Sequence, residues 1–294
     1  MPTDHPRPAV LEDGPRAIDV HAHPPTEEFL IEAGGEYMAD AADGFGTELV
    51  TTTFDEMKAQ YRDAGIDRAV LLAWDAETTT GRPPVTNEYV ASAVAEHPEF
   101  FIGFASVDPL KPDCVETAER AIDDLGLSGF KFQQAAQGFD PSDDDHTELF
   151  DTIESLGVPC IFHGGNTQFG GGVPGGRGLK LRYCDPMLLD ELAAEHPGLD
   201  IIIAHPAFPW EREQLATCLH KANVYMDLSG WLPRYIDETV LHYARTLLQD
   251  KVMFGTDYPM LAPERWLADF AELGYEESVQ RKILWENAEA LLFD

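Results

Sequence analysis

The chain has 294 residues, of which 44% are hydrophobic and 25% are charged, so it can bury an ordinary globular core. This composition excludes a disordered chain, a fibrous protein and a small domain stapled by disulfides. Lys and Arg total 20 against 53 Asp and Glu, which gives a formal net charge of −33. The electrostatic field of a chain with this net charge repels phosphate backbones and anionic lipids, so we expect neither nucleic acid nor a membrane as a partner.

The acidic residues are spread along the whole chain, so they describe an acidic surface rather than an acidic tail. Salt screens repulsion on such a surface, since the Debye length falls to about 3 Å at 1 M. We therefore predict a halophilic protein of a salt-rich cytoplasm, with a merely acidic mesophilic protein as the alternative. The four cysteines form no CxxC pair, which favours free thiols in a reducing compartment. We expect no leader and no membrane span.

Eight short apolar runs recur along the chain, and their character is typical of parallel strands buried on both faces. They are Ala17–His21, Ala69–Trp74, Phe100–Val107, Gly129–Gln133, Pro159–His163, Asp200–His205, Val224–Leu228 and Val252–Asp257. The predicted helices are Thr53–Ala64, Asn87–His97, Asp113–Leu125, Thr147–Leu156, Pro186–His196, Glu211–Lys221, Tyr235–Leu248, Pro263–Leu273 and Glu277–Leu292. Eight βα units predict one α/β domain over residues 1–294, a (β/α)8 TIM barrel with residues 1–15 as an N-terminal extension.

Two of the connections between a predicted strand and the next predicted helix are unusually long. They are residues 24–52 after the first run and residues 164–180 after the fifth. Residues 164–178 contain eight glycines. Long loops within a compact domain are usually functional or mobile. The glycine-rich segment lacks the GxxxxGK[ST] pattern of a phosphate loop. We interpret it as a lid over a substrate, with a flexible surface excursion as the alternative.

Residue types that can ligate metals stand at the ends of four predicted strands. They are His21 and His23 at the first run, and His163, His205 and Asp257 at the fifth, sixth and eighth. Asp19, two residues before His21, is expected on the same face, with a structural hydrogen-bond role as the alternative. Side chains alternate along a strand, so the two histidines of the first run share a face. Active sites of barrels gather at the C-terminal rim, where these residues converge. Imidazole and carboxylate donors suit a divalent metal ion that activates water, Zn²⁺ first, with Mn²⁺, Fe²⁺ or Co²⁺ as alternatives.

This set of residues resembles the amidohydrolase superfamily, in the amidohydrolase-related (Amidohydro_2) branch that includes aminocarboxymuconate semialdehyde decarboxylase and resorcylate-type decarboxylases. The likeness extends from about residue 18 to residue 292, and segments 129–132, 203–210 and 253–259 also carry it. The resemblance implies one metal ion with four ligands, His21, His23, His163 and Asp257. It implies that His205 orients the metal-bound water or stabilises developing charge, and that Asp257 also moves a proton.

Lys131, on the predicted fourth strand, bears on the number of metal ions. In binuclear members of the superfamily a carboxylated lysine on that strand bridges two ions, whereas the decarboxylase branch lacks the bridge. A buried lysine is costly unless it is paired or functional, so we expect a substrate-carboxylate contact or an internal ion pair. Further candidates for substrate binding are Arg177, Trp210 and Trp231, with pairing to the acidic surface and rim packing as alternatives. Gln133 stands where relatives often carry His.

The sequence thus predicts a metal-dependent hydrolase that acts on a small organic acid or ester-like substrate through a metal-activated water. The alternative is a non-oxidative decarboxylase, a carbon–carbon lyase, of a muconate- or resorcylate-like acid, because both reactions use a metal and a proton-handling pair of His and Asp. The net charge of −33 disfavours a metal-dependent nuclease. A non-catalytic metal-binding protein is a further hypothesis. The expected partner is a small molecule, and the resemblance implies a homodimer.

Overall fold

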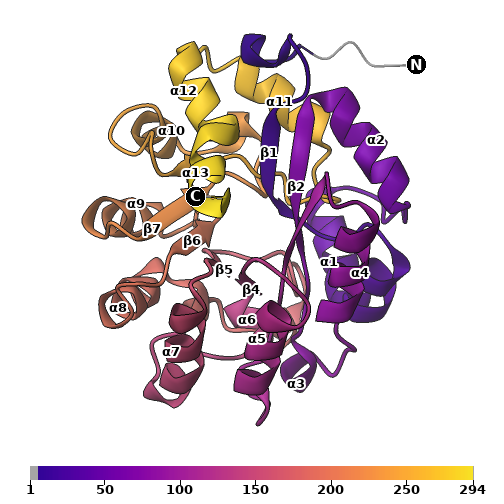
Figure 1. The fold of residues 1–294 in the computed structure, drawn as a ribbon, viewed down its shortest axis with the longest axis vertical. Helices are drawn as coiled ribbons and strands as arrows, with labels where there is room; N and C mark the ends of the chain where they lie inside the picture. Colours follow the sequence, from indigo (N-terminus) through magenta and orange to yellow (C-terminus); the bar gives the residue numbers. More distant parts are fainter. Residues whose placement is uncertain (1–5, 294) are drawn as a thin grey trace.

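The computed structural model describes residues 6–293 and places eight parallel strands inside a ring of helices (Figure 1). The strands are β1 (Ala17–Ala22), β2 (Ile66–Leu72), β3 (Phe101–Phe104), β4 (Phe130–Phe132), β5 (Cys160–His163), β6 (Ile201–Ala204), β7 (Val224–Asp227) and β8 (Val252–Met253). Most are buried along their whole length, as strands between a helical layer and a barrel interior must be. The (β/α)8 barrel is confirmed. Of the expected N-terminal extension, residues 1–5 lie outside the described residues.

The strands pair in two continuous groups, β1 to β3 and β4 to β8. Single bridges join the groups into a ring, Ala105 with Phe130 on one side and Ala22 with Tyr258 on the other. On the first side the Lys131 N–H also donates to the Ala105 carbonyl at 2.7 Å. The second bridge sets the residues after β8 beside the residues that end β1. Chain segments more than 230 residues apart are thereby brought together at one rim.

The outer layer consists of helices that follow the strands in turn. They are α1 (Gly35–Phe45), α2 (Phe54–Ala64), α3 (Glu77–Thr80), α4 (Asn87–Glu96), α5 (Cys114–Asp123), α6 (Gln134–Gln137), α7 (Thr147–Leu156), α8 (Pro186–Glu195), α9 (Glu211–His220), α10 (Glu238–Ala244), α11 (Pro263–Ala271), α12 (Glu277–Arg281) and α13 (Asn287–Phe293). The C-terminal helices lie beside β1 and α2, where the ends of the barrel sequence meet (Figure 1). Within residues 6–293, no helix combines the length and apolar character that crossing a bilayer needs.

Several predicted boundaries differ from the structure. β2 begins at residue 66 rather than 69, because Asp67 and Arg68 are half-exposed and interrupt the apolar pattern of a strand that includes them. The helix predicted over residues 235–248 is only α10, since Asp237 caps it: the Asp237 carboxylate accepts the Thr239 N–H at 2.8 Å. A single helix over residues 277–292 is also interrupted, by a π-helical turn at Lys282–Glu286.

The connection over residues 24–52 is structured, which the sequence did not predict. It contains a π-helical turn, Glu28–Ala33, followed by α1. Met38 and Ala41 lie on the buried side of α1, three residues apart, so a helical face covers this rim of the barrel. This segment and the glycine-rich connection both contribute to the pocket described below.

Candidate metal centre and active site

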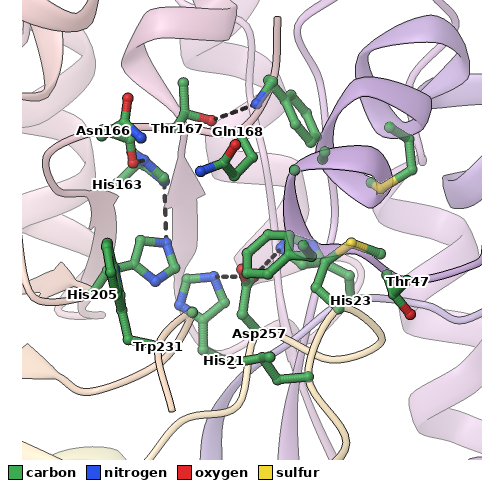
Figure 2. A pocket seen from close by; sticks show the side chains of 18 of the residues that line it. His21, His23, Thr47, His163, Asn166, Thr167, Gln168, His205, Trp231 and Asp257 are labelled. Atoms are coloured by element: carbon green, nitrogen blue, oxygen red, sulfur yellow. Dashed lines mark hydrogen bonds and ion pairs between the residues drawn. The ribbon is translucent and has the colours of Figure 1, made fainter. Parts of the chain in front are cut away.

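A pocket opens at the end of the barrel toward which the strands run, and the five residues predicted to bind the metal or handle the proton line it. They are His21, His23, His163, His205 and Asp257 (Figure 2). β1 and the residue after it supply the first two, β5 ends at the third, and the last two follow β6 and β8. The cavity has a volume of about 450 Å³, within the range of small-molecule sites. The structure therefore brings these five residues together.

Three of these side chains form a compact donor set. Asp257 Oδ1 lies 3.6 Å from His21 Nε2 and 3.5 Å from His23 Nε2. A four-coordinate ion with bonds of about 2.0–2.2 Å separates its ligand atoms by about 3.3–3.6 Å, so these spacings suit a divalent metal. His23 Nδ1 is buried without a hydrogen-bond partner among residues 6–293. The residues present thus fit a metal ion by their donor chemistry and by the spacing of the three ligand atoms, whereas the unpartnered Nδ1 is the nitrogen of His23 that does not face Asp257.

Asp227, the last residue of β7, orients the His21 ring. Its Oδ2 lies 3.1 Å from His21 Nδ1. Burial raises the pKa of Asp227, but the hydrogen bonds that its carboxylate accepts from His21 and Ser229 outweigh burial and hold that pKa well below its ordinary value. Burial lowers the pKa of His21 to about 3, so the imidazole is neutral. His21 therefore carries its proton on Nδ1, and Nε2 keeps a lone pair for a metal.

Sequence reasoning did not single out Asp227. It closes the seventh apolar run, Val224–Leu228, in the same way that Asp257 closes the eighth. An acidic residue at the end of a buried strand was therefore a signal available in the sequence.

A row of hydrogen-bonding groups crosses the other side of the pocket. His163 Nε2 lies 3.1 Å from the Asn166 carbonyl, and His163 Nδ1 lies 3.2 Å from His205 Nε2. His205 Nδ1 lies 2.8 Å from Ser229 Oγ, which donates to Asp227. The row has four contacts, and each needs one hydrogen. When both rings are neutral, His163, His205 and Ser229 supply only three, because the groups at the two ends, a carbonyl and a carboxylate, can only accept. The row is complete when it gains one proton, as suits a site that moves protons.

His205 and Asp257 both adopt the left-handed backbone conformation, with φ of 65° and 66°. For residues with a Cβ this costs about 1–3 kcal/mol, and such strain gathers at functional sites. Hydrogen bonds maintain it: the His205 N–H donates to Asp227 Oδ1 at 3.0 Å, and the Asp257 N–H donates to the His21 carbonyl at 2.8 Å. The backbone also passes close to His205 at Gly230, where a Cβ would lie 2.7 Å from His205 Nδ1.

Asp19 lies outside the donor set and ties β1 to the segment after β8. Its Oδ1 accepts the N–H groups of His21 and Thr256 at 2.9 and 3.0 Å, and its Oδ2 accepts the Tyr61 hydroxyl at 2.9 Å. Burial raises the pKa of Asp19 to about 7, while the hydrogen bond from the Thr256 hydroxyl opposes the shift. Asp19 therefore positions the neighbours of His21 and Asp257 rather than joining the donors around a metal.

Lys131 is a buried cation in the pocket. Its side chain is 2% exposed, and Nζ lies 3.3 Å from His21 Nε2. Burial lowers the pKa of Lys131 to about 8, with Asp227 and Asp257 partly opposing the shift. No carboxylate oxygen within residues 6–293 comes within 4.0 Å of Nζ, so the internal ion pair expected as one alternative is not formed. The ammonium contacts His21 but has no carboxylate to neutralise it, so its charge is available to an anionic group of a substrate.

The remaining substrate candidates separate into two groups. Trp231 lines the pocket, and Trp210, just before α9, does not. Arg177 is also outside the lining: it forms an ion pair with Asp40 of α1, with Nη2 at 2.9 Å from Oδ1, and lies over the Tyr37 ring at 5.6 Å. Arg177 thus pairs with the acidic surface, and this pair joins the two long connections.

Comparison with known proteins places the chain in a family. The sequence model of the amidohydrolase family, Amidohydro_2, matches residues 18–293. The 2-amino-3-carboxymuconate-6-semialdehyde decarboxylase of Dictyostelium discoideum is 25% identical over 236 residues, which cover 69% of this chain and 64% of that protein. The chain therefore spans less than two thirds of the length of this curated relative.

Solved structures share the fold. An uncharacterised TIM-barrel protein from Bordetella bronchiseptica superposes with a TM-score of 0.80 at 22% identity, over 94% of this chain and 98% of that one. A dihydroxybenzoic acid decarboxylase from a Polaromonas species, solved with manganese and the inhibitor 2-nitroresorcinol, gives 0.69 at 20% identity, over 95% and 97% of the two chains. At these identities the likeness establishes the barrel.

Proposed function

The chain belongs to the amidohydrolase family, and on that premise we propose that it is a metal-dependent decarboxylase, a carbon–carbon lyase, of a small aromatic or conjugated acid. One observation carries the proposal: a metal-type donor set and the unpaired buried ammonium of Lys131 share one pocket. The named activities of the Dictyostelium and Polaromonas proteins support this reading over the hydrolysis that the sequence alone put first.

We propose that one divalent ion is held by His21, His23 and Asp257 together with His163. In the structure the two ring nitrogens of His163 contact Asn166 and His205, so His163 would exchange one of these contacts for the ion. Manganese in the Polaromonas enzyme supports Mn²⁺ as a candidate beside Zn²⁺. When bound, the ion supplies a Lewis acid that withdraws electrons from the reacting acid.

The residues of the pocket divide the remaining tasks. Decarboxylation breaks the bond between a substrate carbon and its carboxylate, leaves the electron pair on that carbon and adds a proton there. His205, at the end of the hydrogen-bonded row, and Asp257, beside the donors, handle this proton. Lys131 binds the negative charge of the acid. The walls offer flat aromatic surfaces and neutral amides, from Phe29, Trp74, Phe169, Trp231, Gln133, Asn166 and Gln168.

The first test is a product assay on metal-loaded protein. We expect CO₂ release from a panel of ortho-hydroxybenzoic and muconate-like acids after loading with Mn²⁺ or Zn²⁺, and loss of that release after chelation. A parallel panel of esters and lactones serves as the control, because a hydrolase would release acid from these without CO₂. Turnover of the ester panel alone would return the hydrolase reading to first place.

We also propose that the protein acts in a salt-rich cytoplasm. The net charge of −33 makes self-repulsion large in dilute buffer, and about 1 M salt reduces the Debye length to about 3 Å. We expect the thermal unfolding midpoint to rise by about 10 °C between 0.1 and 3 M KCl, which corresponds to a few kcal/mol for a chain of this size. An unfolding midpoint that stays constant across this range would contradict the halophilic assignment.

A further inference from the structure

A second cluster of metal-type donors lies away from the pocket, where α7 and α8 end. Asp151 and Glu154 stand three residues apart on α7, and His196 follows α8 directly. His196 Nδ1 lies 3.4 Å from Asp151 Oδ1 and 3.5 Å from Glu154 Oε2. The helices of a barrel run against its strands, so these helix ends lie on the side opposite the active site.

The buried histidine points into this cluster without a partner. His196 is 3% exposed, and within residues 6–293 its Nδ1 makes no hydrogen bond. An unsatisfied buried polar atom is unfavourable and is rare in folded proteins. Its separations from the two carboxylate oxygens exceed the roughly 2.7–3.2 Å of an N–H···O hydrogen bond. They match the edges, about 3.3–3.6 Å, of a tetrahedral ion with bonds of about 2.0–2.2 Å.

The backbone around the cluster fixes one of its carboxylates. Glu154 Oε1 accepts the Gly198 N–H at 2.5 Å, which leaves Oε2 to face His196. A Cβ at residue 198 would lie 2.7 Å from Glu154 Oε1, so the absence of a side chain there lets the carboxylate approach the backbone. α7 and α8 also direct their C-terminal ends toward the cluster, and the partial negative charge of helix C-termini favours a cation.

We propose that Asp151, Glu154 and His196 form a second site for a divalent transition-metal ion, of which Zn²⁺ is the representative. One imidazole and two carboxylates leave a further position open to water, because Asp151 faces solvent. The ion joins α7 to the turn that leads from α8 into β6, and so ties two consecutive βα units together. Because it binds the folded chain, it stabilises the barrel without taking part in the reaction.

The test is a Zn²⁺ titration of metal-free protein by isothermal titration calorimetry in high-salt buffer. We expect two equivalents per wild-type chain. The Asp151→Asn/Glu154→Gln variant retains one, with the other weakened about 100-fold or more, since losing even an outer partner of a ligand costs 10- to 100-fold. Asp190→Asn is the matched control, because Asp190 lies 4.0 Å from exposed His220 in a similar surface pair. It keeps both equivalents.

A second readout separates this site from the active site. In the Asp257→Asn variant, Co²⁺ should still give the visible absorption of a four-coordinate site, and Zn²⁺ should still raise the unfolding midpoint. Adding Asp151→Asn should abolish both signals. A single wild-type equivalent that disappears in Asp257→Asn would overturn the proposal. So would two equivalents in the Asp151→Asn/Glu154→Gln variant, with folding checked by circular dichroism.

Discussion

The Asp257→Asn variant is expected to bind Zn²⁺ or Mn²⁺ in the pocket at least about 100-fold more weakly than the wild type and to turn over at least about 1,000-fold more slowly. The amide keeps the size of the side chain but loses the charge that faces His21 and His23 at 3.6 and 3.5 Å. Loss of a proposed ligand should cost more than the 10- to 100-fold of a lost outer partner, and the carboxylate proposed to handle the proton is lost with it. Metal content per chain and CO₂ release measure the two effects.

The matched control keeps every proposed metal donor and changes the carboxylate that holds the His21 ring and the His205 backbone. Asp227→Asn removes the carboxylate that fixes the proton of His21 on Nδ1, 3.1 Å away. We expect metal affinity to fall by about 10- to 100-fold, less than for Asp257→Asn. Both variants are best measured in the Asp151→Asn/Glu154→Gln background, so that the second site does not contribute to metal content. Full metal content in Asp257→Asn would exclude this residue as a ligand.

The positions of the site residues along the strands could be predicted because two simple regularities act together. Buried parallel strands appear as apolar runs, and a polar residue that closes such a run lies at the C-terminal rim of a barrel. His163, His205 and Asp257 each close a run, and the structure places all three in one pocket. Asp227 obeys the same regularity, although neither the histidine pattern nor the family resemblance includes it.

Other features depend on contacts that no local pattern contains. Whether His163 binds a metal ion or the Asn166 carbonyl depends on the orientation of its ring, which tertiary packing sets. Arg177 looked like a substrate ligand because cations are scarce in this chain, but Asp40, 137 residues away in sequence, pairs with it. α1 was hidden by the two glycines at residues 34 and 35, which weaken the helical signal at its start.

The buried ammonium of Lys131 leads to an expectation in which activity and stability change in opposite directions. We expect Lys131→Met to lower kcat/KM for the acid by about 100- to 1,000-fold, because a desolvated charge contact is lost. The same change should raise the free energy of unfolding of the metal-free protein at pH 7 by about 3 kcal/mol. Burial lowers the pKa of Lys131 from 10.5 to about 8, and every tenfold loss of proton affinity on folding corresponds to about 1.36 kcal/mol.

The sign of this stability effect can be checked through its pH dependence. Between about pH 8 and 10.5 the unfolded chain holds a proton on residue 131 that the folded chain has released, so metal-free wild type should gain stability as pH rises through this window. Lys131→Met should lack the gain. Lys111→Met is the control, since Lys111 is paired with Asp75 at 2.9 Å outside the pocket, and its kcat/KM should stay within about two-fold of wild type. If Lys131→Met lost both stability and activity, Lys131 would serve the core rather than the substrate.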